Sequence, residues 1–225
     1  MKRAVRSRRI QFAPQIRLVH APRRERMVTT EDEGRLLKAI EEAAKSRRYK
    51  KCAQSPLGDV LQIMLDSGMR DGEVVKMRIE HISWIEEFYF NPNGKTRKAR
   101  RQVPLSKRVI ALLRTRVNDR QQGWVFPSRK APSGHVELRG LQKHFRKIAL
   151  HLGIPEELKL YCARHTFGTV AMAETRNPAL VMETMGHEDL QTTMGYMHPE
   201  VSQIKQIIDR RNAKNQELRA SGSVN

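Results

Sequence analysis

Two arginines lie in sequence contexts suited to holding a phosphate group. Arg70 lies in the stretch Ser67–Glu73, and Arg164 lies in the stretch Tyr161–Phe167. Each guanidinium is a planar fork that can donate two hydrogen bonds to phosphate oxygens and keeps its charge at any relevant pH. Both arginines are expected at or near helix starts, where backbone N–H groups also favour an anion. A phosphodiester attacked without a metal needs such charges, because its own oxygens repel nucleophiles.

A tyrosine near the end of the sequence is the candidate nucleophile. The stretch Met185-Gly186-His187 is followed, nine residues after the histidine, by Tyr196. A free tyrosine phenol has a pKa of about 10, and nearby guanidiniums would favour its phenolate form. Attack on DNA would give a phosphotyrosyl ester, which keeps the energy of the broken phosphodiester. Resealing the strand would then require no ATP.

Proton transfer needs further groups, and three residues are suited to it. Lys95, in the turn between two expected strands, is a candidate to protonate the leaving 5′ oxygen. His165 and His187 are candidates to hydrogen-bond the phosphate or to move protons. The run 95–101 holds five basic residues in seven and is expected to contact DNA phosphates. Its members besides Lys95 are Arg97, Lys98, Arg100 and Arg101.

Each of these signals also has a plain structural explanation. A single tyrosine in a helix usually packs or lies on the surface, Arg164 alone suits an ion pair, and a basic run is more often a solvated face. The functional interpretation therefore depends on the order of the whole series along the chain. The remaining histidines show no ligand spacing and are expected to be structural or exposed: His20, His81, His135, His144, His151 and His198.

The charge of the chain points to a polyanionic partner. The 225 residues carry a formal net charge of +19. Such an excess repels itself unless a polyanion neutralises it, so nucleic acid is the expected partner, ahead of an acidic membrane surface. No apolar run approaches the roughly 18 residues of a membrane span. Residues 1–26 hold nine Lys or Arg and one acid, and are expected to form a basic arm or linker.

The cysteines and carboxylates give no sign of a metal or a cofactor. Cys52 and Cys162 are far apart and form no CxxC pair, so neither a disulfide framework nor a zinc site is expected. No carboxylate cluster or His/Cys spacing suits a catalytic ion. We therefore expect chemistry without metal or cofactor, in a reducing cytoplasm.

Helices must position most of the candidate residues. Thr29–Glu33 offers a hydroxyl cap followed by acids and predicts a helix start, and a second helix is expected from Pro56 to Gly68. A short third helix is expected to carry Glu73–Met77. Further helices are predicted from Ser106 to Val117, from Leu141 to Leu152, over 162–174, 178–185 and 188–197, and from about Pro199 onward.

A change of period between residues 81 and 105 predicts a small antiparallel sheet. Asn91–Gly94 is a turn cluster. The expected strands are 81–85, 88–90 and 102–105. The chain is thus expected to be mainly α with a small antiparallel β-sheet, an α+β class. Its predicted organisation is the arm, one domain over 27–200, and a C-terminal helix and tail over 201–225.

Taken in order, these motifs resemble the catalytic domain of the tyrosine recombinases, the phage integrase family, from about residue 27 to about residue 200. In that family the first arginine follows a Thr/Ser-Gly-Leu/Met triplet, as Arg70 does, and an acid three residues on, here Glu73, supports the site. The family's hairpin lysine corresponds to Lys95, with Lys98 close by. The remaining catalytic residues correspond to Arg164, His165, His187 and Tyr196.

Two features depart from the family pattern. Tyr161 stands where the family usually has a histidine, three residues before the second arginine. A phenol can donate a hydrogen bond to phosphate but is a poor base at neutral pH. The family also usually carries a helical core-binding domain ahead of the catalytic one, whereas only the basic arm precedes residue 27 here. We expect either a fragment of a longer protein or a short form.

The resemblance implies a site-specific recombinase or integrase acting on double-stranded DNA. Tyr196 would cleave one strand to leave a 3′-phosphotyrosyl link and a free 5′-hydroxyl, and another strand's 5′-hydroxyl would then displace the tyrosine. A monomer when free would assemble as a homotetramer on paired DNA sites, at the nucleoid in a bacterial or phage setting. Two alternatives are a catalytically weakened DNA-binding integrase remnant and a type IB topoisomerase-like enzyme.

Overall fold

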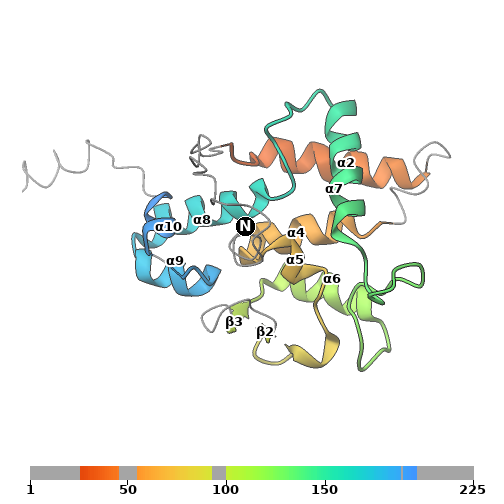
Figure 1. Cartoon of the computed structure of the whole chain (residues 1–225), viewed down its shortest axis with the longest axis horizontal. Helices are drawn as coiled ribbons and strands as arrows, with labels where there is room; N and C mark the ends of the chain where they lie inside the picture. Colours follow the sequence, from red (N-terminus) through yellow and green to blue (C-terminus); the bar gives the residue numbers. More distant parts are fainter. Residues whose placement is uncertain (1–25, 46–54, 93–99, 189, 197–225) are drawn as a thin grey trace, which may run out of the picture.

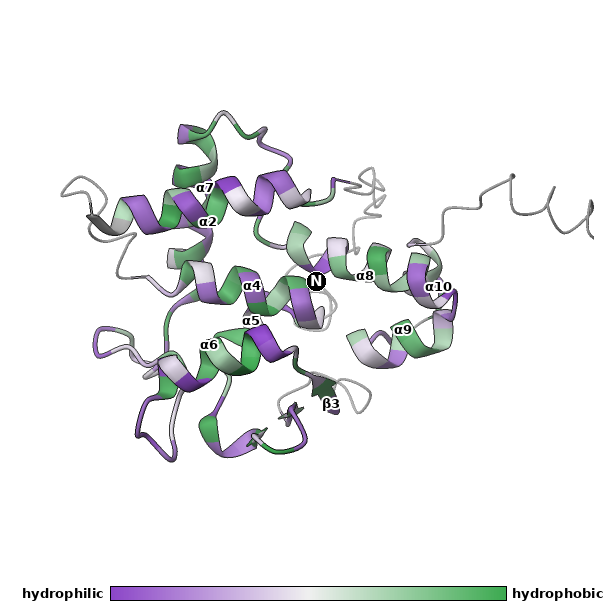
Figure 2. Ribbon diagram, turned by 180° about the vertical axis from the view of Figure 1, so that it is seen from behind, coloured by the Kyte–Doolittle hydropathy of each residue, from purple (hydrophilic) through white to green (hydrophobic). Residues whose placement is uncertain are grey.

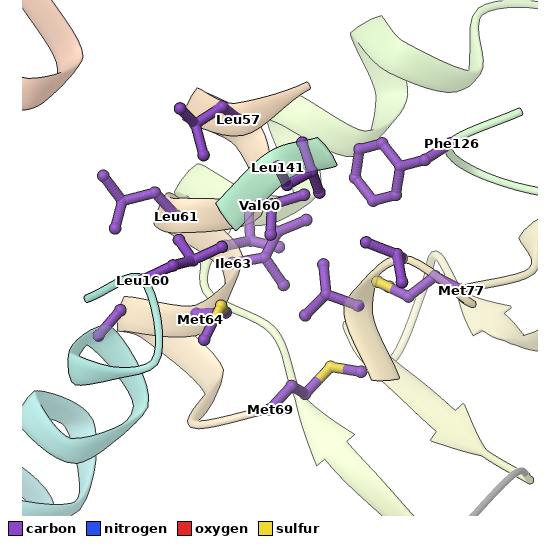
Figure 3. Packing of buried hydrophobic residues seen from close by; sticks show 14 of the residues in the cluster. Leu57, Val60, Leu61, Ile63, Met64, Met69, Met77, Phe126, Leu141 and Leu160 are labelled. Atoms are coloured by element: carbon purple, nitrogen blue, oxygen red, sulfur yellow. The ribbon is translucent and has the colours of Figure 1, made fainter. Parts of the chain in front are cut away.

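Helix α4, Leu57–Ser67, lies at the centre of the hydrophobic core. The computed structural model describes residues 26–45, 55–92, 100–188 and 190–196. Figure 3 shows apolar side chains of α4, among them Val60 and Ile63, close to Leu141, with Phe126 in the same cluster. Burial of these side chains is the main force that holds the fold together. The helices that contact α4 are α2 (Thr30–Lys45), α5 (Asp71–Val74), α6 (Lys107–Val117), α7 (Leu138–His151) and α8 (Cys162–Thr175) (Figure 1).

The helix boundaries follow local signals in the sequence. The Thr29 hydroxyl accepts a hydrogen bond from the Asp32 N–H at 3.0 Å, and Ser106 accepts one from Val109 at 3.2 Å. Gly68 ends α4 in the left-handed region, with φ of 64°. The predicted helix starts are confirmed at these places. The third helix, predicted over 73–77, is shorter and begins earlier, at Asp71.

The sheet has three antiparallel strands in the order β1-β2-β3. They are β1 (Ile82–Ser83), β2 (Phe88–Asn91) and β3 (Arg101–Pro104), and a 3₁₀ turn, η2 (Ile79–His81), leads into β1. In β3 the side chains alternate, with Arg101 and Val103 buried and the next residue after each exposed. The strand predicted over 81–85 is cut short because Glu87, with φ of 55°, closes a tight turn before β2.

Helices α8, α9 (Pro178–Met185) and α10 (Leu190–Met194) lie together on one side of the molecule in both ribbon views (Figures 1 and 2). They enclose a second, smaller apolar cluster made of Met172, Val181, Met185 and Tyr196. The first two helices match their predicted ranges. The third, predicted over 188–197, is shorter, and Tyr196 follows its end in a turn.

The mainly α fold with a small antiparallel sheet is confirmed. Residues 1–25, the tip of the hairpin at 93–99 and the predicted C-terminal helix and tail lie outside the described residues. The predicted arm and the boundaries at 27 and 200 therefore stay predictions. Within the described ranges, no helix combines the length and apolar character needed to cross a membrane.

Candidate catalytic site

Arg70 lies between α4 and α5, immediately before the first residue of α5. Its backbone N–H and its Nη1 both donate to the carboxylate of Glu73, at 3.0 and 2.9 Å. Its Nη2 donates to the carbonyl of Gly186 at 3.1 Å. The Arg70 side chain still exposes 38% of its surface. This guanidinium is therefore fixed by protein groups and remains accessible to a phosphate.

Arg164, in the first turn of α8, has no exposed surface. Its Nη1 donates to the carbonyl of Gly68 at 2.5 Å and its Nη2 to the carbonyl of Met185 at 2.9 Å. Its Nε is buried without a hydrogen-bond partner among the described residues. Burial, together with the positive charge of Arg70, lowers the pKa of Arg164 to about 10, so the guanidinium stays charged at neutral pH. Arg164 thus ties the loop before Arg70 to the end of α9.

Arg101 does not lie where the basic run predicts it. The sequence predicts it among the DNA contacts, but the structure turns it inward, with 7% exposure. Its Nη2 lies 3.2 Å from a Glu73 carboxylate oxygen, and its Nε donates to the carbonyl of Thr184 at 2.7 Å. The reason is the two-residue period of β3, which places Arg101 on the same inner face as Val103. Arg100, by contrast, is exposed, as a DNA contact requires.

Glu73 therefore lies between two guanidiniums. Burial alone would raise the pKa of this carboxyl, but the charges and hydrogen bonds of Arg101 and Arg70 outweigh that effect and hold it below its usual value. Glu73 is consequently ionised at neutral pH. It anchors Arg70 through a side-chain and a backbone hydrogen bond, and its supporting role in catalysis stays a prediction.

Tyr196 is packed beside two histidines and is 9% exposed. The ring centroids of Tyr196 and His165 are 5.1 Å apart, and those of Tyr196 and His187 are 5.9 Å apart in a stacked arrangement. Gly168 of α8 makes room for the phenol, because a methyl group there would stand 2.9 Å from ring carbons Cε1 and Cζ. The structure thus brings Tyr196, His165 and His187 together.

His187 follows α9 and is buried, with 5% exposure. Its Nδ1 lies 2.8 Å from the hydroxyl oxygen of Thr193, which is itself fully buried in α10. This contact fixes the ring orientation of His187 next to Tyr196. Sequence reasoning missed both Thr193 and Gly168. Both are small residues within the motifs that carry Tyr196 and Arg164. Their roles depend on how α9 packs against α8 and α10, which no local pattern specifies.

Tyr161 lies at the edge of the site and is 47% exposed. It precedes α8 and lines a cavity of about 430 Å³ together with Arg146 of α7 and Lys159. A second cavity, of about 930 Å³, lies between the sheet and α9 and is lined by Arg100, His187 and others. Lys95, Arg97 and Lys98 lie outside the described residues.

The described residues converge on one place with complementary chemistry. Two fixed guanidiniums supply positive charge, a carboxylate holds one of them, and a tyrosine lies beside two imidazoles. Such an arrangement can bind a phosphate, stabilise the extra charge of its transition state and offer an oxygen nucleophile. Within the described ranges, no group of three or more His, Cys, Asp or Glu side chains is arranged to hold a metal ion.

Comparison with known proteins places the chain in a family. The family model described as the phage integrase family matches residues 26–203. The curated tyrosine recombinase XerD of Rhizobium meliloti (strain 1021) is 27% identical over 191 residues, covering 80% of this chain and 60% of that protein. The chain spans about half to three fifths of the length of the first curated relatives it matches.

Solved structures share the fold. The Tn1549 transposon integrase in complex with circular intermediate DNA gives a TM-score of 0.66 at 17% identity, covering 83% of this chain and 67% of that one. The catalytic domain of bacteriophage HP1 integrase gives a TM-score of 0.55 at 22% identity, covering 81% of this chain and 93% of that one. With the fold matched and the family model spanning well over half of its length, this chain belongs to the phage integrase family of tyrosine recombinases.

Proposed function

We propose that this chain is the catalytic part of a site-specific recombinase that cuts and rejoins double-stranded DNA. The observation that carries the proposal is the convergence of Arg70 and Arg164 with Tyr196, whose ring lies beside those of His165 and His187. The net charge of +19 supports a DNA partner.

In the proposed reaction, the Tyr196 hydroxyl gives its proton to His165 or His187, and its oxygen forms a bond to the phosphorus of one strand. The bond from phosphorus to the 5′ oxygen breaks, leaving a 3′-phosphotyrosyl link, and the leaving oxygen takes a proton from Lys95 or Lys98. A 5′-hydroxyl from another strand then attacks the phosphotyrosyl link and releases the phenol. Arg70 and Arg164 stabilise the charge that develops on the phosphate oxygens. His165 and His187 hydrogen-bond the phosphate or move protons.

A phosphate must gain access to buried groups for this reaction to proceed. Arg164 has no exposed surface and Tyr196 is 9% exposed. Because Tyr196 packs in the small apolar cluster with Met185, whose carbonyl accepts a hydrogen bond from Arg164, we propose that DNA binding moves Tyr196 relative to α8. The packing lost is small, since that cluster has four buried members.

The partner assembly is part of the same proposal. Strand exchange between two DNA sites requires two cleaving subunits at each site, so a homotetramer on paired sites, formed from free monomers, is the expected working form. Its place of action is bacterial or phage DNA at the nucleoid, in the cytoplasm. No metal or cofactor is needed, because the arginines and the lysine supply the charge and the proton.

The experiment that tests the proposal is covalent trapping. Wild-type protein is incubated in EDTA with nicked suicide substrates that lose the 5′-hydroxyl fragment after cleavage, and the protein–DNA adduct is resolved in denaturing gels. We expect wild type to form the adduct and Tyr196→Phe, which removes one oxygen and keeps the ring, to form none while binding DNA equally well. An adduct that persists in Tyr196→Phe would move the nucleophile elsewhere, with Tyr161 the next candidate.

Tyr161 is the observation that favours the alternative of a non-catalytic DNA-binding remnant, because the family usually has histidine there. An adduct formed by wild type excludes that alternative. A recombinase should recombine paired sites and should not relax supercoiled DNA as a monomer. A type IB topoisomerase-like enzyme should do the reverse.

A further inference from the structure

Arg101 is a buried cation at the meeting point of three elements. It begins β3, its Nη1 and Nη2 lie 3.4 and 3.2 Å from the Glu73 oxygens of α5, and its Nε donates to the Thr184 carbonyl near the end of α9 at 2.7 Å. Its side chain is 5% exposed. A guanidinium in this position offers no surface to DNA, so its role must be exerted through the groups that it holds.

The group that it holds most directly is Glu73. The same carboxylate accepts hydrogen bonds from the backbone and from Nη1 of Arg70. A carboxylate bonded to a single flexible side chain can rotate, whereas one held by the fork of Arg101, by Nη1 of Arg70 and by a backbone N–H has a fixed orientation. Arg101 therefore fixes the anchor from which Arg70 projects.

The second group is the turn that carries His187. Gly186 has φ of 66°, and a methyl group there would stand 2.8 Å from Nη1 of Arg101. The Gly186 carbonyl also accepts a hydrogen bond from Arg70 at 3.1 Å. Arg101 and Arg70 thus hold the same turn, one through the Thr184 carbonyl and close packing and the other through the Gly186 carbonyl.

We propose that Arg101 is a positioning residue for phosphoryl transfer, which sets the orientation of Arg70 through Glu73 and fixes the turn that bears His187. The proposal rests on the recombinase function proposed above. It assigns Arg101 an effect on the rate of strand cleavage rather than on DNA affinity. Lysine cannot replace it fully, because one ammonium group cannot bond Glu73 through a fork and Thr184 at the same time.

The first experiment compares Arg101→Met, Arg101→Lys and a control, Arg116→Met. Arg116 also pairs with a carboxylate, through its Nε at 2.7 Å from Asp59, but on α6 and α4 away from the site. Single-turnover cleavage is measured at saturating protein, with DNA affinity and thermal unfolding measured alongside. We expect the cleavage rate to fall about 100-fold in Arg101→Met and about tenfold in Arg101→Lys, because a small displacement of a catalytic group has effects of this size. DNA affinity should be nearly unchanged.

The control should cleave at the wild-type rate. If Arg101→Lys cleaves like wild type, or if the loss in Arg101→Met equals its fraction of unfolded protein, Arg101 is only structural and the proposal is wrong. If wild type itself forms no adduct, the proposed function fails instead, so the two failures are distinguishable.

The second experiment asks through which group Arg101 acts. The double variant Arg101→Met with Glu73→Gln should lose little more activity than the worse single variant, because both changes release Arg70. A substrate with sulfur in place of the leaving 5′ oxygen needs no proton donor, since a thiolate leaves unprotonated. We expect the loss in Arg101→Met to persist on this substrate. If the fold losses in cleavage rate of the two single variants multiply in the double variant, Arg101 does not act through Glu73. If Arg101→Met regains the wild-type rate on the sulfur substrate, it acts on proton donation instead, and the proposal is wrong.

Discussion

The core around α4 and the unit formed by α8, α9 and α10 bury different kinds of groups. The α4 core is a large set of apolar side chains. The α8–α10 unit has a small apolar cluster, and beside it lie buried polar groups: Arg164, His187 and Thr193. Apolar burial stabilises without needing partners, whereas each buried polar group requires them. We therefore expect mutations in the α4 core to lower stability alone, whereas mutations in the α8–α10 unit should slow strand cleavage as well.

The largest effect in the α8–α10 unit is expected from Arg164→Ala. The change removes charge from the transition state and should slow strand cleavage by on the order of 3 kcal/mol or more, about 150-fold. It also leaves the carbonyls of Gly68 and Met185 without their buried donors, which should lower the free energy of unfolding by about 1–3 kcal/mol. Single-turnover cleavage and urea unfolding measure the two effects. Wild-type cleavage by this variant would remove Arg164 from the mechanism.

The matched change in the other region is Leu61→Ala. Leu61 is fully buried in α4, so truncation should lower the free energy of unfolding by about 2–5 kcal/mol through lost burial and a cavity. At a temperature where the variant is folded, its cleavage rate should equal that of wild type. A large loss of rate in fully folded Leu61→Ala would show that the core and the site are coupled.

Gly168→Ala tests the packing of Tyr196, the proposed nucleophile, with a smaller expected effect. The new methyl group would stand 2.9 Å from two Tyr196 ring carbons and 3.0 Å from the Met185 sulfur. We expect the unfolding free energy to fall by about 1–3 kcal/mol from overpacking and cleavage to slow about tenfold from displacement of the phenol.

Gly140→Ala is the control for that change. Gly140 lies in α7, and a methyl group there would meet no heavy atom within 4 Å. Alanine should therefore stabilise the helix by up to about 1 kcal/mol and leave cleavage unchanged. If both glycine variants cleave at the wild-type rate, Gly168 does not position Tyr196.

Most of the fold was predictable because its boundaries are encoded locally. Ser106 caps α6, Gly68 ends α4 and Pro178 begins α9, and each signal acts within a few residues. The predicted ends are wrong where contacts between distant elements determine where a strand or helix stops. The turn at Glu87 shortens the first strand, and the helix after His187 ends at Met194 so that Tyr196 can pack beside the two histidines.

The site was predictable in its chemistry and less so in its geometry. Arg70, Arg164, His187 and Tyr196 are identified by residue type and motif, but a motif does not state which way a side chain points. The alternation of Arg101 with Val103 was a signal for an inward arginine, and the high charge of the run 95–101 obscured it. The contact of His187 with Thr193 depends on how α9 and α10 meet, which no local pattern specifies. The role of Lys95 stays a prediction.

The smallest effect is expected at Tyr161. The sequence motif places this residue in the candidate site, but the structure leaves its side chain largely exposed at the edge of α8. Tyr161→His restores the residue usual in the family and should leave cleavage intact or raise it, since an imidazole can also accept a proton near neutral pH.

Tyr161→Phe removes only the hydroxyl. If that hydroxyl donates to the phosphate, DNA affinity or cleavage should fall by about two- to tenfold, the value of one hydrogen bond. Affinity and single-turnover cleavage are measured on the same substrate for both variants. A Phe variant indistinguishable from wild type would make Tyr161 a packing residue, and a His variant that loses activity would mean that the surroundings of this position, including Arg146 and Lys159 around its cavity, are adapted to a phenol.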